Sequence, residues 1–98
     1  MTALELKKQL DDQVDLQVVD LREPYEHEDG FISEINIPLA EVMNRVNELN
    51  TDKNIVLYCN SGKRSKSMIF MLQKQHGLNN ISHLEGGYQA WLEQVEFA

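Results

Sequence analysis

Residues 57–65 read Leu57-Tyr58-Cys59-Asn60-Ser61-Gly62-Lys63-Arg64-Ser65, so that an apolar segment ends in the chain's single cysteine and a short polar loop follows. The segment leading up to this cysteine, from Ile55, is apolar and begins with β-branched side chains, as a buried parallel strand does. Residues 65–75 instead repeat apolar side chains at the spacing of a helix. We therefore expect Cys59 at the carboxyl end of a strand, in the loop that leads into a helix.

This position favours a reactive thiolate at Cys59. Ligands bind at the carboxyl ends of the strands in open α/β sheets, and a tight loop there turns backbone N–H groups toward one centre, which stabilises an anion. Neighbouring cations also lower the pKa of a thiol, and Lys63 and Arg64 supply them. A cysteine at the end of a core strand is often only a small apolar residue, but the Gly-Lys-Arg-Ser run behind Cys59 favours a nucleophile.

The remaining pattern predicts one α/β domain over residues 1–98. The hydrophobic share of 42% and the charged share of 26% are those of an ordinary globular protein. Apolar residues recur at helical spacing in residues 3–12, 39–50, 65–75 and around Trp91, with a short helix expected after Pro24. Short apolar segments at 16–21, 35–37, 55–58 and 81–84 alternate with them. This alternation predicts a mostly parallel central sheet of four to five short strands with helices on both faces.

Composition excludes several classes of function. A net charge of −7 repels phosphate backbones, so no nucleic-acid partner is expected. One cysteine and three scattered histidines offer neither a disulfide nor a metal site. His27 and His83 are interpreted as ordinary histidines, and no cofactor is expected. No apolar stretch approaches the ~20 residues that span a bilayer, and the amino terminus lacks the apolar region of a secretory signal. We expect a cytoplasmic protein without a membrane partner.

Residues 59–65 resemble the active-site loop of rhodanese-type sulfurtransferases, and the resemblance extends over nearly the whole chain. Residues 20–24 with Glu26 resemble the first signature of that family, and Gly86-Gly87 ahead of Trp91 resembles the last. The resemblance implies that Asp20 lies near the site and that Arg22 and Glu26 pair beneath it as supporting residues. It also implies a sharp turn at Gly86 and Gly87 close to the cysteine loop, with Trp91 packed underneath.

The sequence departs from the family pattern in two places. Residues 30–34 read Gly30-Phe31-Ile32-Ser33-Glu34, where Phe31 replaces the usual histidine and the following turn is one residue shorter. The family also carries a strand ahead of the first helix, and this chain starts almost at that helix. We expect the first departure to change the local turn and the second to leave the edge strand absent or very short.

The resemblance implies transfer of a sulfane sulfur from a small anionic donor such as thiosulfate to a thiol, cyanide or a protein acceptor. Cys59 would be the nucleophile and would carry the sulfur as a persulfide. Lys63 and Arg64 would bind the anionic end of the donor. The backbone N–H groups of the loop would stabilise the sulfur anion, which makes the following residues candidates for substrate binding: Asn60, Ser61, Gly62, Lys63, Arg64 and Ser65.

Two other functions are compatible with the sequence. The chain could be a sulfur-carrier or interaction module that serves an E1-type sulfur-activating system. It could also be a Cdc25-like phosphatase or an arsenate reductase, which share a similar architecture but have one more residue between the cysteine and the arginine. Four residues separate Cys59 from Arg64. The shorter loop predicts space for one sulfur atom, whereas the longer loop opens enough to hold a tetrahedral oxyanion.

Overall fold

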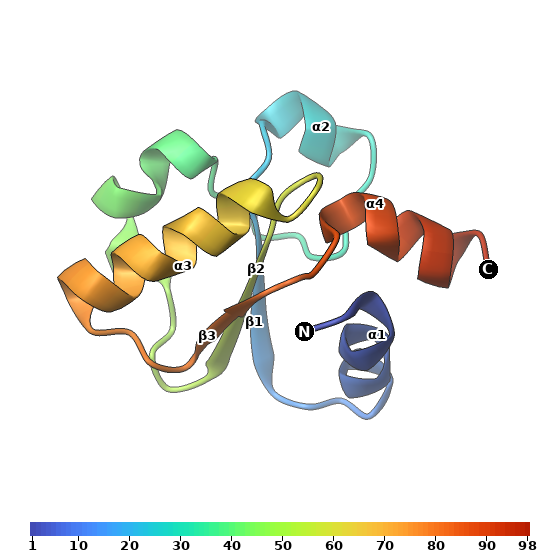
Figure 1. Cartoon of the computed structure of the whole chain (residues 1–98), viewed down its shortest axis with the longest axis horizontal. Coiled ribbons are helices and arrows are strands. Elements are labelled where there is room, and N and C mark those ends of the chain that lie inside the picture. Colours follow the sequence, from blue (N-terminus) through green and yellow to red (C-terminus); the bar gives the residue numbers. More distant parts are fainter.

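The computed structural model describes residues 1–98 and contains a parallel sheet of three strands. The strands lie side by side in chain order (Figure 1) and are β1 (Leu16–Asp20), β2 (Asn54–Tyr58) and β3 (Ile81–His83). Val18 lies opposite Val56, and Leu57 lies opposite His83. Because the strands are parallel, their carboxyl ends share one edge of the sheet, and Cys59 follows directly after the middle strand.

The sheet is smaller than predicted, since four to five strands were expected. Residues 35–37 do not form a strand, and only an isolated bridge joins Asn36 to Asp20. Pro38 follows at once and cannot donate to a ladder, which leaves the pairing one residue long. At the other edge, Met1 makes two backbone hydrogen bonds. Its amino group donates to the carbonyl of His83, and its carbonyl accepts from the N–H of Glu85. As expected, the edge strand ahead of the first helix is absent.

Helices cover both faces of the sheet, as predicted (Figure 1). One face carries α1 (Ala3–Asp11) and α4 (Gly87–Trp91), which continues into the π-helical turn η3 (Leu92–Glu96). The other face carries α3 (Lys63–His76) and the 3₁₀ turns η1 (Leu39–Asn44) and η2 (Val46–Glu48). The short helix α2 (Pro24–Glu28) lies near the edge where the strands end. None of these helices has the length and apolar character needed to cross a lipid bilayer.

Residues 39–50 were predicted to form one helix, and this prediction is wrong. They form η1 and η2, which are separated at Arg45. Asn44 and Asn47 are weak helix formers, and short 3₁₀ turns commonly serve as connectors. Val42 and Leu49 are nevertheless buried in the core. The apolar spacing therefore indicated correctly which residues are buried, but not that they share a continuous helix.

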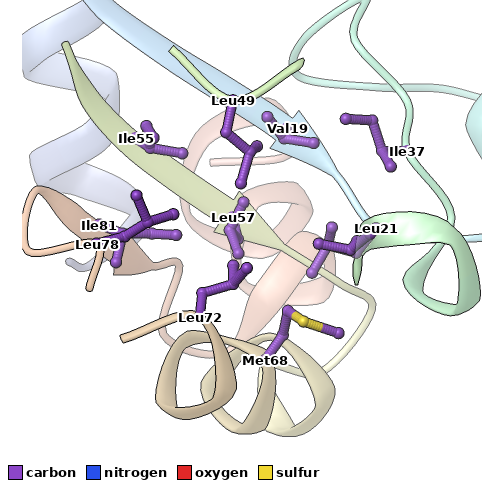
Figure 2. Close-up of a cluster of buried hydrophobic side chains, with 11 residues drawn as sticks. Val19, Leu21, Ile37, Leu49, Ile55, Leu57, Met68, Leu72, Leu78 and Ile81 are labelled. Carbon is purple, nitrogen blue, oxygen red and sulfur yellow. The ribbon is translucent and has the colours of Figure 1, made fainter. Parts of the chain in front are cut away.

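The core consists of two layers because alternate residues of a strand face opposite sides of the sheet. Val19, Ile55 and Leu57 face α3, and Figure 2 shows Met68 and Leu72 of this helix pointing toward the strand that carries Leu57. On the opposite side the second layer contains residues of β1, β2, α1 and α4, together with Leu84 just after β3: Ala3, Leu6, Val18, Val56, Tyr58, Leu84, Tyr88 and Trp91. Met71 was predicted to be core but is 38% exposed, since it lies at the outer edge of α3.

Candidate active site

The sulfur of Cys59 lies at the amino end of α3, in a loop that leaves this residue only 4% exposed. Gly62 has φ +96°, a conformation that favours glycine, and it turns the chain into the helix. Its N–H donates to the Sγ of Cys59 at 3.1 Å, and the N–H groups of Ser65 and Arg64 in the first turn of α3 also lower the pKa of this thiol. The backbone N–H groups and the positive end of the helix dipole therefore favour the anionic form of Sγ.

These contacts change the acidity of the thiol. Burial by itself raises the pKa of Cys59, but the hydrogen bonds from Ser65, Gly62 and Arg64 together outweigh it, so that the pKa lies below its ordinary value. The hydroxyl of Ser65 is fully buried, lies 3.7 Å from Sγ and donates to the carbonyl of Gly62 at 3.0 Å. Because the thiolate is the nucleophilic form of cysteine, the loop increases the reactive fraction at neutral pH.

The beginning of α4 holds the other side of the loop. The N–H of Tyr88 donates to the carbonyl of Cys59 at 2.8 Å, and the N–H of Gln89 donates to the carbonyl of Asn60 at 3.1 Å. Since the C=O and N–H of a trans peptide point in opposite directions, these bonds turn the following N–H groups away from α4. A Cβ on Gly87 would lie 2.5 Å from the carbonyl oxygen of Cys59. Gly86 and Gly87 thus lie against the cysteine loop, as predicted.

Cys59 lines a cavity of about 480 Å³. From the loop, Asn60, Ser61 and Arg64 line it, and the following residues line the rest: Leu21, Arg22, Glu23, Tyr25 and Glu26. Lys63 does not line this cavity. It borders a separate apolar hollow along α3, which Arg64 also lines. Of the two cations predicted to bind the donor, only Arg64 therefore faces the sulfur's cavity.

Asp20 and Arg22 form a buried ion pair behind the cavity. The Nε and Nη2 of Arg22 donate to the two carboxylate oxygens of Asp20 at 3.0 and 2.8 Å. Burial alone raises the pKa of Asp20, but the hydrogen bonds from Arg22 and His27 outweigh it and hold the pKa below its ordinary value. The predicted pair between Arg22 and Glu26 is not formed. The carboxylate of Glu26 accepts from the N–H of Glu23 at the start of α2, because the buried Asp20 is the nearer acceptor for the guanidinium.

His27 was not predicted to have a partner, and this interpretation is wrong. Its Nδ1 lies 2.8 Å from Oδ2 of Asp20, so the Nδ1–H donates to the carboxylate. Its ring stacks on Phe31 with centroids 4.5 Å apart. Asp20 ends a strand and His27 belongs to a helix, so no local pattern in the sequence indicated the contact. The unusual Phe31 is therefore joined through His27 to the ion pair behind the cavity.

Comparisons with known proteins agree with this geometry. A model of the rhodanese-like domain matches residues 2–94. A sulfurtransferase from Allochromatium vinosum is 34% identical over 87 residues, which are 88% of this chain and 80% of that protein. The crystal structure of a rhodanese-related protein from Thermoplasma volcanium superposes with a TM-score of 0.84 at 35% identity, covering 97% of this chain and 91% of the other.

Some relatives are longer than this chain. The putative sulfur carrier protein YrkF of Bacillus subtilis is 34% identical over 91 residues, which are 92% of this chain but 49% of that protein. The uncharacterized protein YqhL of the same organism is 42% identical over 76 residues, which are 76% of this chain and 60% of YqhL. Since one family model matches almost every residue and the superposition extends over nearly the whole fold, the chain belongs to the rhodanese-like domain family.

Proposed function

We propose that the chain is a sulfurtransferase that moves a sulfane sulfur from a donor such as thiosulfate to a thiophilic acceptor through a persulfide on Cys59. One observation carries the proposal: the N–H of Gly62 donates to the Sγ of Cys59 beside a cavity that Cys59 lines, and the backbone N–H groups of Ser65 and Arg64 also lower the pKa of this thiol. Fixed donors of this kind stabilise an anion without reorganising during the reaction. They would favour both the attacking thiolate and the persulfide anion that replaces it.

In the first half-reaction, the thiolate of Cys59 attacks the outer sulfur of thiosulfate. A new S–S bond forms, and the bond between the outer and the central sulfur of thiosulfate breaks. Its electron pair leaves with sulfite, so that charge and atoms balance and the enzyme holds a persulfide. Arg64 lines the cavity and would bind the sulfonate end of the donor.

In the second half-reaction, a nucleophile such as cyanide or a thiolate attacks the outer sulfur of the persulfide. The S–S bond breaks, its electron pair returns to Cys59 as thiolate, and the acceptor leaves with the sulfur. The same amides that stabilise the starting thiolate would stabilise this leaving group. The name of the Allochromatium vinosum relative, sulfurtransferase, agrees with this chemistry but names no donor.

A sulfur-carrier role is the second candidate, and the rim of the cavity favours it. Glu23 and Glu26 line the cavity together with Arg64, and their negative charge opposes the entry of a small dianion. A persulfide delivered by another protein does not carry the double negative charge of such a donor. One relative is named a putative sulfur carrier protein.

Turnover assays distinguish these roles. Thiosulfate with cyanide or a small thiol should give turnover that Cys59→Ser abolishes. Slow turnover with every small acceptor and rapid turnover only with a protein thiol would favour the carrier role. Hydrolysis of an aryl phosphate that depends on Cys59, without any sulfur transfer, would overturn both and favour a phosphatase.

A further inference from the structure

A second hollow of about 470 Å³ adjoins the Cys59 cavity, and Arg22 and Glu26 line both. We call it the aromatic hollow, because ring side chains and carboxylates make up most of its wall: Phe31, Tyr88, Phe97, Glu26, Asp29 and Glu96. It lies between the segment that follows α2 and the end of the chain after α4, which are both on the right of Figure 1. None of the steps of sulfur transfer described above uses it.

Two of the three aromatic rings of the hollow are exposed, and the third, Tyr88, is buried. Phe31 is 45% exposed and Phe97 is 76% exposed. Phe31 is nevertheless held in place, because it stacks on His27 with the ring planes 17° apart and His27 is bound to the buried Asp20. A ring that is already fixed loses little conformational entropy when a partner covers it. This arrangement places an ordered aromatic surface where the family pattern has a histidine.

The charge of the hollow is negative. Glu26, Asp29 and Glu96 contribute carboxylates, and the only cation in its wall is Arg22. Arg22 is already paired with Asp20, and its guanidinium lies over the ring of Tyr88, 4.1 Å from the centroid. Oε1 of Glu96 accepts from the indole of Trp91, which leaves its other oxygen available. Aromatic faces beside unpaired carboxylates are the surroundings that bind Lys and Arg side chains.

We propose that the aromatic hollow docks a basic segment of a partner protein whose cysteine exchanges sulfur with Cys59. The inference rests on the proposed function, and it identifies the partner as a protein with Lys or Arg near its reacting cysteine. In the exchange, the partner's thiolate attacks the outer sulfur of the Cys59 persulfide, and the S–S bond breaks. Cys59 leaves as the thiolate and the partner holds the persulfide, so that no further reagent is needed.

A binding assay without sulfur chemistry tests the docking surface. The probes are two fluorescent peptides of equal length, one with a central serine between Lys and Arg residues and one with these residues replaced by Gln. We expect the basic peptide to bind at least about tenfold more tightly at low salt, with the preference falling as ionic strength rises. Equal affinity for the two peptides, or tighter binding of the Gln peptide, would overturn the proposal.

Matched variants distinguish binding in the aromatic hollow from attraction by the overall negative charge. Glu96→Gln with Phe97→Ala removes one charge and one ring from the hollow, and Gln can still accept from Trp91. Glu93→Gln with Phe70→Ala removes the same groups from exposed positions outside it. The first pair should lose most of the preference for the basic peptide, and the second pair should keep it. An equal loss in both pairs would mean attraction by net charge alone and would refute the docking site.

An assay of sulfur transfer tests whether docking in the hollow serves Cys59. Peptides with a central cysteine in place of serine are offered to protein already loaded with persulfide, and the basic peptide should accept sulfur faster in proportion to its tighter binding. Equal rates despite unequal binding would overturn the claim that docking serves the cavity. If thiosulfate loads no sulfur but the basic peptide still binds selectively, the proposed function fails while the binding arm still supports the docking surface.

Discussion

Replacing Gly87 with alanine should displace the cysteine loop. Gly87 has φ +61°, and a Cβ there would lie 2.5 Å from the carbonyl oxygen of Cys59 and 2.6 Å from the carbonyl carbon of Asn60. Both contacts are with backbone, so relief requires the loop to move away from α4. Such a movement strains the hydrogen bond from Tyr88 to the carbonyl of Cys59 and disturbs the amides around Sγ.

The magnitude follows from two costs. A non-glycine residue in the left-handed region costs roughly 1–2 kcal/mol, and forcing a methyl group into a packed contact costs about 1–3 kcal/mol more. The free energy of unfolding should therefore fall by about 2–5 kcal/mol, less than the full stability of a typical domain. Persulfide formation should slow by more than the unfolded fraction explains, because the displaced loop weakens the hydrogen bond from the Gly62 N–H to Sγ.

Gly77→Ala is the matched control. Gly77 also has a positive φ, +64°, but a Cβ there would meet nothing within 4 Å. It should lose only the roughly 1–2 kcal/mol of backbone strain and keep the rate of persulfide formation. Urea unfolding and the rate of sulfur uptake, measured on both variants, make the comparison. Equal losses in the two variants would refute the argument that Gly87 is needed for close approach to the cysteine loop.

Further outcomes are expected at the same site. Because the folded pKa of Cys59 lies below that of an ordinary thiol, its alkylation should stay fast at pH values where a free cysteine has become slow. The same ionisation raises the free energy of unfolding above the ordinary thiol pKa, and this gain is lost as the pH falls through the folded pKa. A pH dependence of the alkylation rate that matches that of a free cysteine would contradict this prediction. Asp20→Asn should cost about 3–5 kcal/mol in urea unfolding, because it leaves Arg22 buried without its carboxylate partner; a loss below 1 kcal/mol would show that the pair contributes no more than a surface one. Arg64→Ala should raise the KM for thiosulfate roughly tenfold, with Lys63→Ala, which is outside the cavity, changing it far less; the reverse order would contradict the assignment of Arg64.

Local patterns made the strand, the loop and the helix around Cys59 predictable. β-branched residues before the cysteine, Gly62 at the turn and Gly77 at the end of α3 each act over a few residues, and the structure agrees with them. Local patterns did not predict which of the two cations, Lys63 or Arg64, faces the cavity. Successive residues of a helix point about 100° apart, so only the placement of the helix decides which of the two faces the cavity.

Contacts that follow no helical or strand period account for the rest of the differences. His27 binds Asp20 across seven positions, and the buried carboxylate, rather than any helical or strand period, brings them together. The carboxylate also takes the guanidinium that was expected to pair with Glu26. Residues 35–37 have the composition of a strand but pair only at Asn36, because a strand requires a neighbour along its length. Sequence patterns predict the local tendency, and the tertiary partner decides the outcome.

The intact mass of the protein after incubation with thiosulfate tests the central claim most directly. The native chain should gain the mass of one sulfur atom, cyanide should remove it, and Cys59→Ser should gain nothing. A glycine inserted after Gly62 lengthens the loop between Cys59 and Arg64, and this variant should lose the added sulfur as well. An unchanged mass in the native chain, or an added sulfur that persists in Cys59→Ser, would contradict the persulfide on Cys59.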